Sequence, residues 1–413
     1  MKSFVFWMLF ASALGMVKIV ALAQVLPAAG FGDYAMIVGT SGFATMAISL
    51  GLIEGTIKRF PRHWVDGQTK PMVEESWAIV RSTALRGFMI TIVFCAMGFL
   101  AGGSRWSILA LFVGILGTAG LFSRVLSALN LAIGQQSTIR NFSLFRSAAS
   151  FFAAVLGGYL GGWQGAAIGE IMAVALNLAQ GIFGLRTMLD LFSSDRRTSY
   201  APPEADGTLY SSALLTSSTI LSDRAVVNAL AGSYVTGSYS FVMILGQIGQ
   251  VFVNIVGQKV GPDIIRAVKE HGGMGKTLRE MTIAGVIVCV VSLAATLVFL
   301  GAMNLAITSS IFAKFDIGTV DVVLSGIACI FYYYVILEYA LIAYNRESDV
   351  FRASLASVIS YSVSIGISHY FSLGVSGFIS AFLAARMTQT IWLGWALKIQ
   401  LRIAANREVG LSV

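Results

Sequence analysis

Apolar residues run through the chain in stretches of about 20, and short polar segments separate them. An α-helix needs about 20 mainly apolar residues to cross the hydrocarbon core of a membrane. By this criterion the sequence predicts twelve transmembrane helices. They are expected near residues 4–26, 34–57, 78–101, 107–129, 142–160, 165–185, 212–231, 238–260, 279–302, 318–343, 351–370 and 375–397.

Composition agrees with this pattern. Of the 413 residues, 56% are hydrophobic and only 12% are charged, whereas a soluble globular protein is about one quarter charged. The expected class is therefore an all-α polytopic membrane protein. The three cysteines lie inside apolar runs and the three histidines are scattered, so neither a disulfide framework nor a metal site is indicated. No cofactor is predicted.

The basic residues are distributed unevenly between the two sides of the predicted topology. On one side the loops and adjoining helix turns carry 23 lysines and arginines, including Arg124 and Arg146, and the other side carries only Arg105 and Lys314. By the positive-inside rule, both termini are expected in the cytoplasm. The formal net charge of +8 is thus mainly a topology signal, and nucleic-acid binding is not expected.

The N-terminus has a second interpretation. Lys2, an apolar run and the segment Ala21-Leu22-Ala23 before Gln24 also fit a cleavable secretory signal. Lys18 interrupts that run, and the segment takes part in an internal repeat, which favours a first transmembrane helix. An intact mature N-terminus would decide between the two.

The chain divides into two related halves. Residues 186–211 form the longest polar connection and contain Pro202-Pro203, which indicates a cytoplasmic linker. It separates a six-helix bundle at 1–185 from a second at 212–397, which a tail at 398–413 follows. Gly32-Asp33-Tyr34 matches Gly237-Ser238-Tyr239 at an offset of 205 residues, and residues 145–150 resemble residues 351–357 at an offset of 206.

An even number of spans in each half places the two halves in the same orientation, related by an axis along the membrane normal. Two such bundles leave a cleft at mid-membrane that opens alternately to either side as they rock. The predicted architecture therefore favours a transporter.

Charged residues inside the predicted spans are the candidate site. Each costs about 2.5–3.5 kcal/mol at the bilayer centre on insertion scales, so such residues are expected to face protein or water. The sequence Asp223-Arg224 interrupts the seventh span near its middle. The candidate cavity cations are Lys18, Arg86, Arg224 and Arg386, and the candidate coupling or ion-pair acids are Glu170, Asp223 and Glu338.

Structural ion pairs are the alternative interpretation of these charges. Neighbours on a helix point about 100° apart, so Asp223 and Arg224 need other partners. Asp223 could pair with Lys18 or Arg386, and Arg224 with Glu170 or Glu338. Glu54 is expected to pair locally with Lys58. The cations outnumber the deep acids, which favours an anionic substrate, and arginine suits phosphate because its planar fork donates two parallel hydrogen bonds.

Several of these motifs resemble a known family. A Leu-Pro pair followed by Gly32-Asp33-Tyr34, a small-residue helix ending at Gly51, Asp223-Arg224 in the seventh span and Gly237-Ser238-Tyr239 before the eighth are similar to the polysaccharide and O-antigen repeat-unit flippases. These belong to the multidrug/oligosaccharidyl-lipid/polysaccharide (MOP) exporter superfamily. The resemblance covers both halves of the chain.

The resemblance implies a MATE-like arrangement of twelve spans around a cationic cavity in the bacterial inner membrane. It also implies transport of undecaprenyl-diphosphate-linked oligosaccharides from the cytoplasmic to the outer leaflet. Polysaccharide polymerase and chain-length proteins are partners consistent with this role. Lipid II flippases of the superfamily have two more spans, for which the chain has no room. Multidrug exporters of the superfamily share the twelve-span plan, but their cationic drugs suit a more acidic cleft.

Other features leave alternatives open. Tyr333 and Tyr334 in the tenth span could contact sugars, although aromatic clusters in membrane helices also serve packing. No nucleophile or phosphate-loop pattern indicates an enzyme, and the segment ending Gly275-Lys276-Thr277 has His271 where a Walker loop needs glycine. The remaining alternatives are a membrane enzyme acting on lipid-linked glycans, which the short outer loops disfavour, and a scaffold for polysaccharide assembly.

Overall fold

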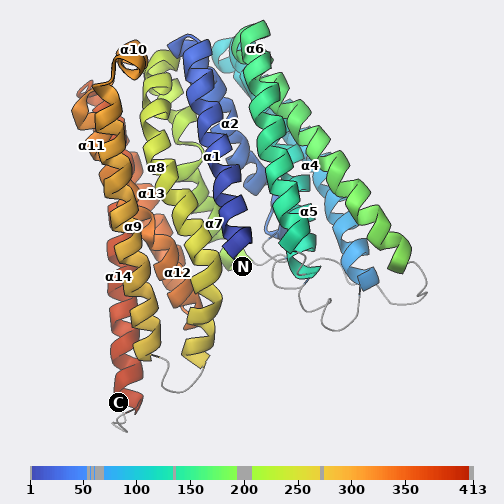
Figure 1. Cartoon of the computed structure of the whole chain (residues 1–413), viewed down its shortest axis with the longest axis vertical. Coiled ribbons are helices and arrows are strands. Elements are labelled where there is room, and N and C mark those ends of the chain that lie inside the picture. Colours follow the sequence, from blue (N-terminus) through green and yellow to red (C-terminus); the bar gives the residue numbers. More distant parts are fainter. Residues whose placement is uncertain are drawn as a thin grey trace. The chain divides into compact units, whose positions relative to one another are not determined.

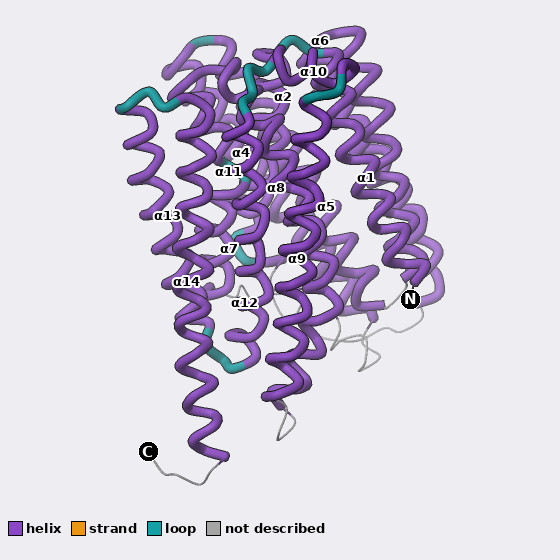
Figure 2. The backbone as a smooth tube through the Cα atoms, turned by 60° about the vertical axis from the view of Figure 1, so that its left-hand side comes forward, coloured by secondary structure: helices purple, strands orange, loops and turns teal. Residues whose placement is uncertain are grey.

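The computed structural model describes residues 2–53, 56, 60, 69–133, 136–192, 207–269 and 274–408. The described part is helical throughout, with short connections and no strand (Figure 2). The helices, labelled in Figure 1, are α1 (Lys2–Val25), α2 (Ala28–Ser49), α4 (Thr69–Gly102), α5 (Ser104–Ile133), α6 (Gln136–Phe192), α7 (Gly207–Ile220), α8 (Asp223–Lys269), α9 (Met274–Met303), α10 (Ala306–Lys314), α11 (Thr319–Ile330), the 3₁₀ turn η1 (Phe331–Tyr333), α12 (Tyr334–Ala343), α13 (Glu347–Tyr370) and α14 (Gly374–Glu408).

In the described part of the chain, each predicted transmembrane segment lies mainly on helix. Among the described residues, eight ranges are long and apolar enough to cross a membrane. Two of them, of 43 and 44 residues, are each about twice the length of one span. The first of these long ranges lies within α6 and joins the predicted spans 142–160 and 165–185. The all-α polytopic membrane fold is therefore confirmed.

Glycines with non-helical backbone angles divide the long helices α6 and α8 into two arms each. Gly162 has φ 62° and ψ −148° inside α6, and Gly232 has φ 82° and ψ 174° inside α8. Both conformations lie in the positive-φ region that glycine adopts without steric cost. The turn in α6 folds its two arms together, since a Cβ on Gly157 would collide with the backbone oxygen of Gly165.

The helix bounds differ from the sequence prediction at three places. The seventh predicted span is not one helix, because the chain breaks at Leu221 and Ser222 and α8 starts at Asp223. The tenth is divided by η1 into α11 and α12, and α10 forms in a segment expected to be a loop. The predicted Glu54–Lys58 pair and residues 193–206 of the linker lie outside the described residues.

The chain forms two compact units, Met1–Gly237 and Ser238–Val413. The expected bundle boundary within the 186–211 linker stays a prediction. In the first unit, two apolar cores hold α2 against α5, one with α4 through Ile48, Ile79 and Leu121, and the other with α6 through Ile37, Leu109 and Ala167.

In the second unit, the ring of Phe241 on α8 stacks on that of Phe315 at 4.9 Å between centroids, and Tyr332 packs against Phe382. The end of α8, the start of α9 and the C-terminal end of α14 lie at one end of this unit (Figure 1).

Candidate functional site

A buried carboxylate joins three helices of the first unit. Glu170 on α6 accepts a hydrogen bond at Oε1 from Lys18 Nζ on α1 at 2.5 Å and another from the Tyr34 hydroxyl on α2 at 2.6 Å. Its Oε2 accepts one from Ser150 Oγ at 2.8 Å, and Lys18 Nζ also donates to Ser150 Oγ at 2.8 Å. The turn of α6 brings Ser150 and Glu170 together from its two arms. Lys18 and Glu170, which the sequence places 152 residues apart, therefore form one ion pair.

Glu170 also lines a cavity of about 240 Å³ in the same unit. The carboxylate and two guanidinium groups, those of Arg124 on α5 and Arg146 on α6, are the charged groups of its lining. Arg146 is exposed and interacts electrostatically with Glu170. The remaining lining residues are Val38, Ser41, Gly42, Thr45, Leu116, Gly120 and Val174. Two cations and one acid give the lining a positive balance, which suits an anion.

Arg124 and Arg146 were not predicted as site residues, because their positions near predicted span ends fit the basic cytoplasmic flank. A signal for Arg124 was present. Gly117, Gly120 and Arg124 recur at helical spacing and share one face of α5. The two glycines of that face lie against Ala44 and Thr45 of α2, and Arg124 therefore reaches the cavity that α2 lines.

Arg224 lies next to this cavity wall. A Cβ built on Gly39 of α2 would be only 2.6 Å from Arg224 Nη1, so the guanidinium rests on the helix surface one residue from Val38 of the lining. Arg224 is 9% exposed, and its side chain makes no hydrogen bond or ion pair with any residue in the described ranges. A buried cation without a partner is costly, which is consistent with a ligand as its partner.

Asp223 has a local role in the structure. It is the first residue of α8 and is 1% exposed, and its Oδ1 accepts a hydrogen bond from the backbone N–H of Arg224 at 2.8 Å. Backbone N–H groups at a helix N-terminus lack helical partners, and an aspartate there is stabilising. The two charged residues therefore have separate positions: Asp223 begins α8, and the Arg224 side chain lies against α2.

The second unit holds a separate polar cluster. Arg386 on α14 is fully buried and donates from Nη1 to Gln389 Oε1 at 2.7 Å, and Gln389 Nε2 donates to Glu338 Oε1 on α12 at 3.0 Å. The Arg386 guanidinium also lies over the Tyr334 and Phe382 rings, at 5.3 and 5.2 Å from their centroids. Three of the predicted residues therefore meet here, inside the packed unit.

Two predicted residues lie apart from both clusters. Arg86 on α4 is half-buried and is not among the lining residues of the 240 Å³ cavity. Tyr333 is separated from Tyr334 by the change from η1 to α12, and its hydroxyl donates to the backbone oxygen of Met281 at 3.0 Å. The sugar-contact role of the two tyrosines and the cavity role of Arg86 stay predictions.

A further polar cluster in the first unit involves Asp33 of the repeated Gly-x-Tyr motif. Asp33 Oδ1 accepts from Arg105 Nη2 and from Ser233 Oγ, both at 2.7 Å, and from Asn228 Nδ2 at 3.4 Å. Asp33 is buried, and half of the Arg105 side chain is exposed. The cluster fixes the start of α2 to α5 and to the residues on either side of the Gly232 turn.

Comparison with known proteins finds the same fold in solved structures. No protein-family model matches the chain, and no curated protein matches it in sequence. Solved structures with the same fold include a multidrug resistance MATE family transporter of the MOP superfamily in an inward-facing conformation, at 12% identity and a TM-score of 0.66 over 96% of each chain.

Two further structures extend the comparison. A MOP superfamily transporter from Pyrococcus furiosus is 11% identical, with a TM-score of 0.65 over 97% of this chain and 95% of that one. The lipid II flippase MurJ, in an inward closed conformation, is 15% identical, with a TM-score of 0.64 over all of this chain and 92% of MurJ. The protein therefore has the fold of MOP superfamily transporters.

Proposed function

We propose that the protein is a flippase that moves undecaprenyl-diphosphate-linked oligosaccharide repeat units from the cytoplasmic to the outer leaflet of a bacterial inner membrane. The observation that carries the proposal is the charge of the cavity in the first unit, where Arg124 and Arg146 line the wall with a single acid, Glu170. Arginine binds diphosphate through two parallel, charge-assisted hydrogen bonds.

The state of each cation supports a division of roles. Lys18 is already neutralised by Glu170 at 2.5 Å, so it serves mainly to hold that carboxylate. Arg146 is exposed in the cavity, and Arg224 is buried beside it without a protein partner among the described residues. Arg146 and Arg224 are therefore the groups proposed to meet the diphosphate first, while the prenyl chain stays in lipid. Arg124, whose Nη1 donates to Met46 Sδ at 2.7 Å, adds positive charge to the same lining.

Glu170 is the acid proposed to couple transport to an ion gradient. Its carboxylate contacts Lys18 and Tyr34 and interacts with Arg146. An anion that binds Arg146 competes for the positive charge that stabilises the carboxylate, which favours uptake of a proton or sodium ion by Glu170. The termini face the cytoplasm in this proposal, and polymerase and chain-length proteins act on the delivered substrate.

A multidrug exporter is the second candidate, because a MATE family multidrug transporter shares the fold and a buried carboxylate faces the cavity. The MOP superfamily transporter from Pyrococcus furiosus is described as having a binding pocket of reverse polarity that suggests a different function. Cavity polarity is thus the property that should separate the two candidates here.

The test is transport by purified protein in vesicles under a proton or sodium gradient. The proposal predicts translocation of a prenyl-diphosphate oligosaccharide and at least tenfold slower translocation by Arg146→Ala, with normal insertion of the variant. Gradient-driven movement of an organic cation, with no movement of the lipid-linked substrate, would identify an exporter instead.

A further inference from the structure

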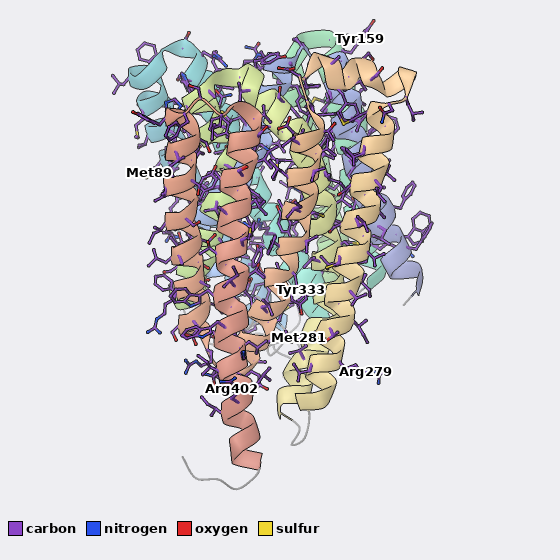
Figure 3. The ribbon with its side chains drawn as sticks, turned by 90° about the vertical axis from the view of Figure 1, so that its left-hand side faces the viewer. Met89, Tyr159, Arg279, Met281, Tyr333 and Arg402 are labelled. Atoms are coloured by element: carbon purple, nitrogen blue, oxygen red, sulfur yellow. The ribbon has the colours of Figure 1, made fainter. Side chains whose placement is uncertain are left out.

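The second unit contains an open groove that the proposed function does not use. It has a volume of about 430 Å³ and lies between the start of α9 and the end of α14, with residues from η1 and α12 at its base. Figure 3 looks onto this face, where Met281 and Tyr333 lie between the two helices and Arg402 lies toward the end of α14. Its lining is Leu278, Met281, Thr282, Tyr333, Leu337, Gly394, Leu397, Lys398, Leu401 and Arg402.

The charge of this groove is one-sided. Lys398 and Arg402 are exposed and lie four residues apart on α14, so they share one helix face, and the lining contains no acid. Neither makes an ion pair or hydrogen bond with a residue in the ranges that the structure describes. Like charges at this spacing repel each other. An anion between the two side chains would relieve that repulsion.

The rest of the groove is apolar. Leu278 and Met281 form one wall, Leu397 and Leu401 form the other, and the hydroxyl of Tyr333 is occupied by the backbone oxygen of Met281 at 3.0 Å. These walls offer little hydrogen bonding to a polar ligand. The groove therefore fits a molecule with an anionic head and an apolar body.

Nearby aromatic residues place the groove at the level of lipid headgroups. Trp392 and Trp395 lie on α14 one to two turns before the basic pair, and their rings contact edge to face at 6.4 Å between centroids. Trp395 is 61% exposed. Exposed tryptophans of membrane proteins concentrate at the membrane–water interface. Lys398 lies about 5 Å beyond Trp395 at 1.5 Å per residue.

We propose that this groove binds an anionic glycerophospholipid of the surrounding leaflet. Its phosphate lies between Lys398 and Arg402, and its acyl chains follow the leucine walls toward the hydrocarbon core. Basic pockets between transmembrane helices bind anionic lipid headgroups by this combination of charge and apolar contact. A soluble phosphate would use only the two cations and leave the apolar walls in water. The lipid joins α9 to α14, and its binding does not depend on which substrate the protein transports.

The experiment measures lipid affinity of the purified full-length protein by native mass spectrometry, with phosphatidylglycerol titrated against phosphatidylethanolamine. We expect wild-type protein to prefer phosphatidylglycerol by about 25-fold, because each basic residue near an anionic headgroup contributes a factor of about five. The double variant Lys398→Ala/Arg402→Ala should lose this preference. Arg279→Ala is the control variant. It removes a cation at the start of α9, next to Leu278 of the groove, but Arg279 itself does not line the groove.

A second variant separates the groove from general surface charge. A Cβ on Gly394 would meet no atom within 4 Å, so Gly394→Leu extends into the groove while it keeps both cations. We expect it to weaken phosphatidylglycerol binding at least fivefold. The proposal is overturned if the double variant keeps the preference, if Arg279→Ala loses it equally, or if Gly394→Leu binds as wild type. Displacement of the lipid by millimolar inorganic phosphate would assign the site to a free anion and also overturn it.

Discussion

The contacts of Glu170 predict that replacing the acid of the Lys18–Glu170 ion pair lowers the free energy of unfolding more than replacing the lysine. Glu170→Gln keeps the shape of the side chain but leaves Lys18, whose side chain is 12% exposed, without its acid. Removal of one partner from a buried ion pair costs about 3–5 kcal/mol. Because the Lys18 side chain is 12% exposed, solvent screens part of its charge. We therefore take about 3 kcal/mol, the low end of that range.

Lys18→Met should cost less. The Glu170 carboxylate keeps hydrogen bonds from Tyr34 and Ser150, at 2.6 and 2.8 Å, and its interaction with Arg146. We expect about 2 kcal/mol, within the range of about 1.5–3 kcal/mol for one hydrogen bond to a charged group. Tyr34→Phe removes a single neutral donor to the carboxylate and completes the series at about 1.5 kcal/mol, the low end of the same range.

Thermal melting of the purified variants in detergent measures this series. For a unit of this size, 1 kcal/mol corresponds to about 2–4 °C in melting temperature. Glu170→Gln should therefore melt about 6–12 °C below wild type. The melting temperature of Lys18→Met should lie between those of wild type and Glu170→Gln. A Glu170→Gln protein that melts within 2 °C of wild type, or a Lys18→Met protein that is the less stable of the pair, would refute the reasoning.

Two further predictions concern the first unit. Asp33→Ala should cost about 1–3 kcal/mol, because it leaves the buried Asn228 amide and the partly buried Ser233 hydroxyl without this acceptor. Arg105→Ala removes a half-exposed ion pair worth at most about 1 kcal/mol; equal melting temperatures for the two variants would contradict this. Gly157→Leu should cost about 1–3 kcal/mol through overpacking, because its side chain would collide with the Gly165 backbone. Gly161→Ala is its control: a Cβ there meets nothing within 4 Å, so its melting temperature should remain within 1 °C of wild type. A fully stable Gly157→Leu protein would show that the α6 arms are not packed as described.

The helical class and most segment positions could be predicted from sequence because apolar runs of membrane length have few other uses. The predicted segment 279–302 lies within α9 at Met274–Met303, and 351–370 lies within α13 at Glu347–Tyr370. Hydropathy does not detect backbone breaks. The predicted span 212–231 reads as one segment, but α7 ends at Ile220 and α8 begins at Asp223.

The candidate site was only partly predictable, because pairing depends on the rotation of each helix and on tertiary contacts. The charge criterion singled out Lys18 and Glu170, but the sequence analysis assigned them to other partners. Arg124 and Arg146 lie near predicted span ends, where arginine usually marks topology. Only the packing of α5 and α6 against α2 shows that both side chains line one cavity.

The central claim is that the cavity selects negative charge, and a competition titration on purified protein tests it directly. Binding of a fluorescent prenyl diphosphate is measured for wild type and for Arg146→Glu, with an organic cation and an uncharged prenyl alcohol as competitors. We expect wild type to bind the diphosphate at least tenfold more tightly than the alcohol, and Arg146→Glu to lose that preference while it keeps its melting temperature within a few degrees. A wild-type protein that binds the organic cation more tightly than the diphosphate would contradict the account.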